Sequence, residues 1–303
     1  MKRHIITILV LILYPCFVNG QDTITTYFDH HWKKCSKASA VYYRKAYPAP
    51  DYSGMWIVED YHMNGLLQMK GKYMNKKFKK QHGVFTYYHY NGKISSTGQY
   101  LNNEKVGMWK SYYKTGSIAI ERKAINNKPD SISTYYHMNG AVLGKANFVK
   151  GKLEGESKWY YESGNISEIC IYQQGKIQSK INYDDSGNII ERVEKDSPPE
   201  FPGGNDKLIA FIQQNLEYPK ELIHTRKSET ILVHFTVRKD GSVGDIEFIK
   251  SEEPLFNKEV IKVFDLITYM NPRRFHGQAV DAEMTIPISF KPNPPDTYQY
   301  IVL

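Results

Sequence analysis

Hydrophobic and polar side chains alternate along the middle of the chain. One stretch shows the pattern well, because its alternate positions carry two separate sets: Ile166, Glu168, Cys170 and Tyr172, and then Ser167, Ile169 and Ile171. A period of two is the strand period, and no helical stripe accompanies it. The 24 tyrosines of the chain favour the same structure, since aromatic residues suit pleated, half-buried surfaces. This region is therefore predicted to be β-structure.

The strands belong to a repeat of about 24 residues. The hexapeptide YYHYNG at residues 87–92 returns as YYHMNG at residues 135–140. Turn residues followed by glycine recur at spacings of 27, 24, 24, 24 and 23, with the glycines at Gly65, Gly92, Gly116, Gly140, Gly164 and Gly187. A second series of turns follows every 24 residues, at 102–103, 126–127, 150–151 and 174–175. Two turns per unit predict one hairpin per unit.

A lone hairpin cannot bury its hydrophobic face, so the units are expected to stack. Six units predict an antiparallel meander of about twelve strands over residues 54–193. The stretches Gly107-Met108-Trp109 … Tyr112-Tyr113 … Gly116 and Gly83-Val84-Phe85 … Tyr87-Tyr88 … Gly92 resemble MORN repeats of the variant often labelled antitoxin components. The resemblance implies a scaffold or binding surface and no reaction. The third unit departs from the pattern, since Pro129-Asp130-Ser131 replaces the glycine that opens a strand.

The tyrosines of the repeats have two interpretations. A flat aromatic face could stack on envelope glycan, and repeats of this kind could also bind lipid. The interpretation we favour is that the rings pack against one another across neighbouring strands.

A second domain is predicted over residues 205–292, after a Pro/Gly-rich linker at 194–204. Its periodicity changes to helical for Leu208, Phe211, Ile212 and Leu216 and again, after Pro254, for Val260, Val263, Phe264 and Ile267. Between the helices lies a hairpin with its turn at Asp240-Gly241, and a last strand runs from about Ala282 to Phe290. Two helices on a three-stranded antiparallel sheet predict an α+β domain. The fold class is therefore mainly β plus α+β.

Motifs in this domain and at the end of the linker resemble the TonB C-terminal domain in its Bacteroidetes-type form. They are Phe201-Pro202-Gly203-Gly204, Tyr218-Pro219-Lys220-Glu221, Asp240-Gly241-Ser242-Val243 and Ile286-Pro287-Ile288-Ser289-Phe290. The resemblance implies that the last strand lies at a sheet edge and pairs with an extended peptide, the TonB box of an outer-membrane receptor. The matching residues are Glu283, Met284, Thr285, Ile286, Ile288 and Ser289. The alternative is that Pro292, Pro294 and Pro295, or the tail at 298–303, cover this edge.

The N-terminus has the pattern of a secretory signal peptide at residues 1–20. Lys2, Arg3 and His4 precede an apolar run at 5–18. As a helix this run would span about 21 Å, less than the roughly 30 Å of a bilayer core. We expect export to the periplasm or cell envelope. An uncleaved membrane anchor at 5–18 remains the alternative. Residues 21–53 and the tail at 293–303 carry no assignment.

Nothing in the sequence predicts an enzyme, a cofactor or a metal site. Asp29-His30-His31 stands alone, and adjacent strand residues point to opposite faces. His234 and Thr236 share one strand face, which we interpret as solvated and not as a catalytic pair. Cleavage would leave two cysteines, Cys35 and Cys170, which could pair but form no disulfide framework. The net charge of +8 is scattered along the chain, so no nucleic-acid partner is expected.

The sequence thus favours a non-enzymatic, exported envelope protein. Its partner would be a peptide of an outer-membrane receptor or of another envelope protein, captured by the last strand, with the repeats as scaffold. Two alternatives stay open. One is an energy transducer for outer-membrane transport, anchored by residues 5–18. The other is an envelope scaffold whose repeats bind glycan or lipid. The sequence does not identify the partner, the cargo or the oligomeric state.

Overall fold

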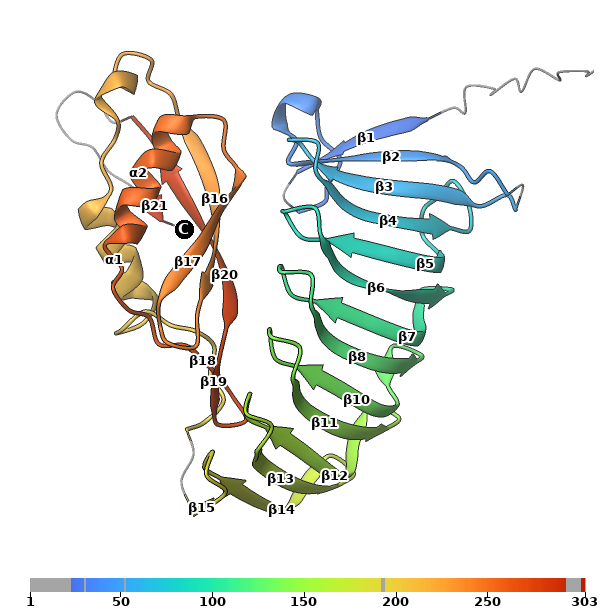
Figure 1. The fold of residues 1–303 in the computed structure, drawn as a ribbon. Coiled ribbons are helices and arrows are strands. Elements are labelled where there is room, and N and C mark those ends of the chain that lie inside the picture. The colour runs from blue at the N-terminus through green and yellow to red at the C-terminus, as the bar shows by residue number, and fades with distance from the viewer. Residues whose placement is uncertain (1–22, 30, 52, 192–193, 293–300, 303) are drawn as a thin grey trace, which may run out of the picture.

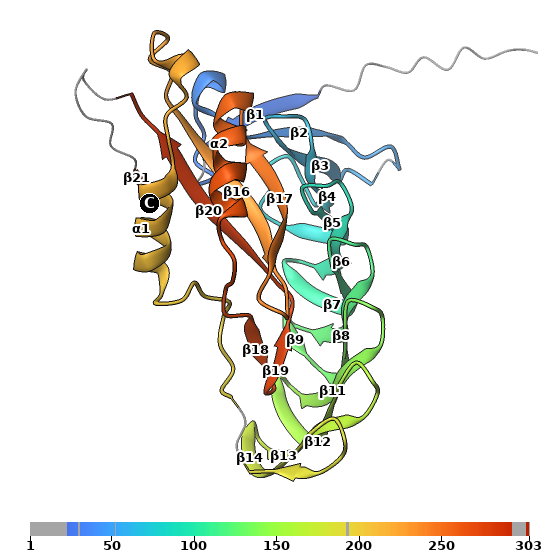
Figure 2. The same cartoon turned by 60° about the vertical axis from the view of Figure 1, so that its left-hand side comes forward.

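The computed structural model describes residues 23–29, 31–51, 53–191, 194–292 and 301–302. They form a long antiparallel sheet and a smaller α+β domain beside it (Figure 1). In both Figure 1 and Figure 2, the smaller domain turns its sheet toward the hairpin turns of the long sheet and keeps its helices on the far side. The predicted signal peptide at 1–20 lies outside the described residues.

The long sheet contains 15 of the described strands, and its neighbours follow sequence order except that β9 pairs with β8 beside the main path. The strands are β1 (Ile24–Phe28), β2 (Tyr42–Pro48), β3 (Trp56–His62), β4 (Leu67–Tyr73), β5 (Gln81–Tyr88), β6 (Ile94–Leu101), β7 (Glu104–Tyr112), β8 (Ile118–Ile125), β9 (Lys128–Pro129), β10 (Ser131–Tyr136), β11 (Val142–Val149), β12 (Lys152–Tyr160), β13 (Ile166–Gln173), β14 (Lys176–Tyr183) and β15 (Ile189–Ile190). The predicted meander is confirmed. It also takes in β1 and β2, from the segment that the sequence left unassigned.

One face of this sheet is built by placing aromatic rings over small residues of the preceding strand. Trp109 of β7 covers Gly98 of β6, where an added Cβ would lie 2.2 Å from the indole. Phe85 covers Gly71 in the same way, and Trp159 covers Gly144. Phe85 is 0% exposed, although the sheet is only one layer thick. We call this the inner face. Its packing explains why the repeat needs glycine in mid-strand, where glycine otherwise weakens a strand.

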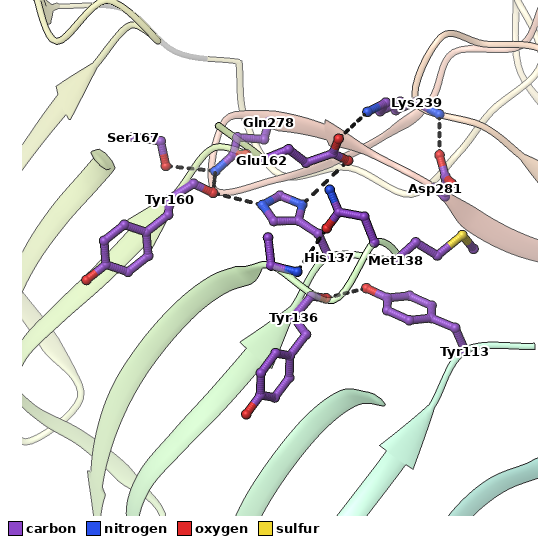
Figure 3. Close-up of polar contacts among 12 residues, drawn as sticks. Tyr113, Tyr136, His137, Met138, Tyr160, Glu162, Ser167, Lys239, Gln278 and Asp281 are labelled. Carbon is purple, nitrogen blue, oxygen red and sulfur yellow. Dashed lines mark hydrogen bonds and ion pairs between the residues drawn. The ribbon is translucent and has the colours of Figure 1, made fainter. Parts of the chain in front are cut away.

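Each hairpin turn is also tied to the next unit by the first side chain of the turn. His89 Nε2 lies 2.8 Å from the carbonyl oxygen of Tyr112, and the Tyr113 hydroxyl donates to the carbonyl of Tyr136. The same contact continues down the sheet, from His137 Nε2 to Tyr160 O and from the Tyr161 hydroxyl to Tyr183 O. Figure 3 shows two of these ties. The tyrosine pairs of the sequence thus serve partly as links between neighbouring units.

Aromatic rings also pack across strands on both faces. Tyr43 and Tyr61 stack with ring centroids 4.9 Å apart, and Phe85 and Tyr100 meet edge to face at 5.0 Å. These contacts are of the cross-strand kind that stabilises sheets.

The irregular third unit keeps the backbone of its neighbours. Gly83, Gly107 and Gly155 open their strands with φ of 88°, 68° and 74°, and Ser131 adopts φ of 70° at the equivalent place. A non-glycine residue is disfavoured in this left-handed region. The repeat geometry therefore outweighs the local preference of Ser131.

The C-terminal domain begins with α1 (Asn205–Asn215) and the short η2 (Lys220–Leu222). The hairpin β16 (Glu229–Val237) and β17 (Val243–Lys250) leads to α2 (Pro254–Asp265), where the Glu253 side chain caps the first turn. The chain ends in β20 (Ala282–Phe290) and β21 (Ile301–Val302). The sheet order is β17-β16-β20-β21. The predicted two helices and three strands are confirmed, and β21 adds a fourth strand.

The core of this domain joins one face of the sheet to the two helices. Its fully buried side chains include Ile212, Phe235, Phe256, Ile288 and Phe290. A separate hairpin, β18 (Arg273–Phe275) and β19 (Gln278–Val280), projects toward the long sheet. No hairpin was predicted here from the sequence, because its two strands have only three residues each.

Within the described ranges, no helix is long and apolar enough to cross a membrane. The apolar run at 5–18 lies outside those ranges.

Candidate functional site

The strand predicted to bind a peptide is β20. It pairs with β16 in an antiparallel ladder of nine residue pairs, from Ala282 opposite Val237 to Phe290 opposite Glu229. On its other side it pairs with β21 only through Ile288 and Ser289. In the described part of the chain, the edge from Glu283 to Pro287 has no second strand. Among the described residues, the tail covers this edge at Ile288 and Ser289, in the manner of the alternative.

The six predicted site residues divide between the two faces of β20. Met284 and Ile286 pack against the core of the domain, and Ile288 is fully buried. Glu283 and Thr285 lie on the opposite face, where they pair with Thr236 and His234 of β16. The structure thus brings all six residues onto one strand. Their backbone groups lie along the same sheet edge, whereas their side chains point to two opposite faces. Side-chain selection would come mainly from the face that carries Glu283 and Thr285.

A row of polar groups runs across this outer face. His234 Nδ1 lies 2.6 Å from the Thr285 hydroxyl, and His234 Nε2 lies 3.5 Å from a carboxylate oxygen of Glu283. Burial by itself raises the pKa of Glu283, but the neighbouring imidazole and the positive charge of Lys114 outweigh it and lower the pKa. Glu283 therefore carries a negative charge at neutral pH.

This face is not the solvated surface that we expected for His234 and Thr236. Thr236 is 3% exposed, and the His234 ring is largely covered. The reason is tertiary, because the sheet of the C-terminal domain faces the turns of the repeats. Lys114 from the turn between β7 and β8 reaches across to Glu247 of β17, at 3.2 Å. The two parts of the chain therefore share one interface.

A cavity of about 710 Å³ opens where β20 begins. Ala282 and Glu283 form one side of it, and Tyr112, Tyr113 and Met138 of the repeat turns form another. The linker at 196–199 and Arg273, Arg274 and Phe275 also line it, and His89, Thr236 and Asp281 complete the lining. Its volume lies within the range of small-molecule and peptide pockets. A strand added beside Glu283 would extend into this space.

The charges around the cavity are mostly satisfied within the protein. Arg274 pairs with Glu194 at 2.5 Å, and the carboxylate of Asp281 accepts the backbone N–H of Lys239 at 2.7 Å. Arg273 lies over the Phe275 ring, 5.0 Å from its centroid, and forms no ion pair with any described carboxylate. It is therefore the most available charged group of the cavity.

The β18–β19 hairpin holds the two parts of the chain together. Gln278 Nε2 donates to the Tyr160 carbonyl at 3.1 Å and to the Ser167 hydroxyl at 2.7 Å. Lys239 pairs with Glu162 at 2.7 Å, next to His137 (Figure 3). No hairpin was predicted over residues 272–280 from the sequence. The turn His276-Gly277, between two short runs rich in large side chains, was the signal that could have revealed this hairpin.

His276 makes the most buried of these contacts. Its ring stacks on Trp159 with centroids 3.6 Å apart, and its Nδ1 lies 2.7 Å from Oε1 of Glu168. Glu168 is 0% exposed and also pairs with Lys180 at 2.5 Å. Burial raises the pKa of Glu168, but the contacts to His276 and Lys180 prevail and lower it to about 2. A buried carboxylate is thus held in its charged form by both parts of the chain.

The other candidate residues lie apart from this site. Asp29 accepts backbone hydrogen bonds from His31 and Lys33, which is a turn arrangement, and His30 lies outside the described residues. No group of three potential metal ligands is found in the ranges that the structure covers. Cys35 and Cys170 are free, and burial together with Glu168 raises the pKa of Cys170 to about 11, which makes its thiol a poor nucleophile.

Comparison with known families finds a match in each of the two parts of the chain. Residues 81–102 and 153–174 match the MORN repeat variant, and residues 214–292 match the C-terminal domain of Gram-negative bacterial TonB proteins. No curated protein matches the chain. Both families are non-catalytic, and the TonB domain is a protein-interaction domain of the Gram-negative envelope. The chain is therefore similar to MORN-variant repeats in its first part and to the C-terminal domain of TonB proteins over residues 214–292.

Proposed function

We propose that this protein captures an extended polypeptide of the cell envelope by adding it as a strand to β20, with the repeats as a rigid scaffold. The observation that carries the proposal is the edge from Glu283 to Pro287, which pairs with no second strand among the residues that the structure describes. An unpaired edge presents a row of N–H and C=O groups that a guest backbone can satisfy. The partner would be a segment of an outer-membrane receptor or of another envelope protein.

The cavity at the start of β20 supports this function. It lies at the open end of the edge, whereas β21 occupies the other end at Ile288 and Ser289. A guest that pairs with Glu283 would place its neighbouring side chains among Tyr112, Tyr113 and Phe275. Aromatic side chains of this kind supply much of the binding energy at interfaces. The repeats would then contribute to selectivity as well as to support.

The contacts between the two parts support the scaffold role. Gln278, His276 and Lys239 all reach side chains or carbonyls of the repeats. Such contacts hold one wall of the cavity at a set distance from the other, which lowers the cost of ordering a guest. We further propose that the protein is exported to the periplasm. A mature N-terminus at Gln21 would exclude the anchored transducer, and retention of residues 5–18 would favour it.

The test is titration of the full chain with synthetic peptides that match TonB-box segments of outer-membrane receptors. The matched control is the same peptide with N-methyl groups on alternate residues, which removes backbone donors and leaves the side chains unchanged. We expect amide resonances of residues 283–287 to shift and the methylated peptide to bind at least about tenfold more weakly. Equal binding of both peptides, or shifts confined to the repeats, would refute strand addition.

A further inference from the structure

A second cavity lies within the repeat sheet, on its inner face and apart from β20. Its volume is about 150 Å³, and it lies between β6, β7 and β8, next to the irregular third unit that begins at Pro129. Trp109 forms one wall with its ring. The remaining lining residues are Ser96, Lys105, Ser111, Arg122, Ala124, Asn127 and Pro129. None of them is acidic, so the lining carries two positive charges and no negative one.

Neither cation of this cavity is neutralised by the protein. Lys105 lies over the Trp109 ring, with its Nζ 4.4 Å from the centroid. Neither Lys105 nor Arg122 forms an ion pair with a carboxylate anywhere in the described residues. Arg44 on the same face shows the contrast, since it pairs with Asp60 at 2.6 Å. Half-buried cations are normally paired in this way.

The two charges also act on each other. Burial lowers the pKa of Lys105, and the positive charge of Arg122 lowers it further. Two like charges in a partly desolvated site disfavour each other. The empty cavity therefore has an electrostatic cost that a bound anion would remove.

The repeat itself does not require these residues. The positions 24 residues before and after Arg122 are Gly98 and Ala146, and those around Lys105 are Gln81 and Pro129. All four are uncharged. Ser133 stands 24 residues after Trp109, where an aromatic ring would cover the position of Arg122 as Trp109 covers Gly98. The small side chain of Ser133 leaves room for the guanidinium of Arg122. A small residue on the later strand thus faces a large one on the earlier strand, the reverse of the arrangement of Trp109 over Gly98.

The hydrogen-bonding groups of the cavity suit an oxyanion. Oδ1 of Asn127 accepts the backbone N–H of Lys105 at 2.8 Å, which leaves the amide NH₂ as a donor. The hydroxyls of Ser96 and Ser111 are further donors. Arginine matches the geometry of phosphate oxygens, and lysine adds a point charge. The volume is below the roughly 300 Å³ at which pockets for drug-sized ligands begin.

We propose that this cavity binds one tetrahedral oxyanion of the phosphate type, either free or as the phosphate monoester of a larger molecule. The two positive charges of the lining, its hydrogen-bond donors and the volume of the cavity all suit one such group. The site is independent of strand addition at β20, because it involves only residues of the repeats. It makes the stretch from β6 to β9 a binding position in an otherwise regular sheet.

The test is calorimetric titration of the full chain with inorganic phosphate and with glycerol 3-phosphate. Flotation with vesicles of phosphatidylcholine, with or without phosphatidic acid, distinguishes a membrane source. The variants are Arg122→Gln and Lys105→Met, and the matched control is Lys123→Gln, which removes the same charge from an exposed neighbour on the opposite face. We expect one binding site and at least a tenfold weaker affinity in the two cavity variants. The control should bind as the wild type does.

Stability without ligand provides a second measure. Because either substitution relieves the repulsion in the empty cavity, both cavity variants should melt at or above the wild-type temperature. A purely structural role would lower it. Binding to phosphatidic acid vesicles alone, lost in Arg122→Gln and kept in Lys123→Gln, would assign the site to a lipid phosphate. Absence of binding to all probes, or equal loss in Arg122→Gln and Lys123→Gln, would overturn the proposal.

Discussion

His276 Nδ1 lies 2.7 Å from Oε1 of Glu168, although the two residues are 108 positions apart in the chain. This contact joins the C-terminal domain to the repeats at a point where Glu168 is fully buried. The carboxylate accepts from His276 and pairs with Lys180. The position of one domain against the other is therefore tied to the charge of one side chain.

Replacing Glu168 by glutamine should remove part of the acid sensitivity of this interface. The pKa of Glu168 is about 2 in the folded chain and ordinarily 4.5, so its charge stabilises the fold above pH 4.5. This contribution is lost as the pH falls from 4.5 toward 2. We expect Glu168→Gln to lower the free energy of unfolding by about 1–3 kcal/mol at pH 7. The difference from wild type should shrink below pH 4.5 in urea titrations.

The control for this prediction is Glu156→Gln, because Glu156 is exposed and pairs with Lys158 at the surface. Its effect should stay below about 1 kcal/mol at any pH. Similar losses of unfolding free energy in both variants would show that the buried contact of Glu168 stabilises the protein no more than a surface ion pair does.

The backbone of the third unit predicts a stabilising substitution. Ser131 adopts φ of 70°, where the neighbouring units carry glycine. Ser131→Gly should therefore raise the free energy of unfolding by about 1 kcal/mol, since glycine has no steric penalty there. Thermal unfolding followed by circular dichroism measures the change. Ser131→Ala serves as control and should show no gain, and an equal gain in both would contradict the argument.

The packing of rings over glycines predicts a destabilising substitution. In Gly98→Ala, the new Cβ would lie about 2.2 Å from the Trp109 ring, so that the indole or the strand must shift. We expect a loss of about 1–3 kcal/mol in the free energy of unfolding. In a Trp109→Leu background, which is itself less stable, the added cost of Gly98→Ala should largely disappear. If Gly98→Ala is equally destabilising in that background, the destabilisation comes from the backbone of β6 and not from a clash with the Trp109 ring.

The pairing of β21 with β20 predicts the effect of a short deletion. Removal of residues 301–303 frees the edge at Ile288 and Ser289, where the tail now competes with a guest strand. Two residue pairs contribute about 1 kcal/mol or more, so peptide affinity should rise roughly threefold to tenfold. Titration with the peptide used for the full chain measures this change. Weaker binding after the deletion would mean that the tail is part of the peptide site.

The amino-acid sequence by itself determined the local architecture of this protein. The 24-residue spacing of turns predicted the hairpins, because Asn-Gly and related pairs set turn geometry over a few residues. The apolar stripes of α1 and α2 predicted two helices on one face of a sheet in the same way. Both inferences rest on the side-chain periods of strands and helices, which can be recognised within a short segment of the sequence. Even β20 was placed at Ala282 to Phe290.

The tertiary structure alone decided how the candidate site is enclosed. Thr236 looked solvated in the sequence because its strand alternates, yet it is buried beside repeat turns more than a hundred residues away. The short β18–β19 hairpin carries no periodic signal, and β21 lies beyond the predicted domain. The partners of Glu168 and the closeness of Lys105 to Arg122 depend likewise on strand register and on domain packing. These relations arise from contacts between distant segments, which a local pattern of residues does not encode.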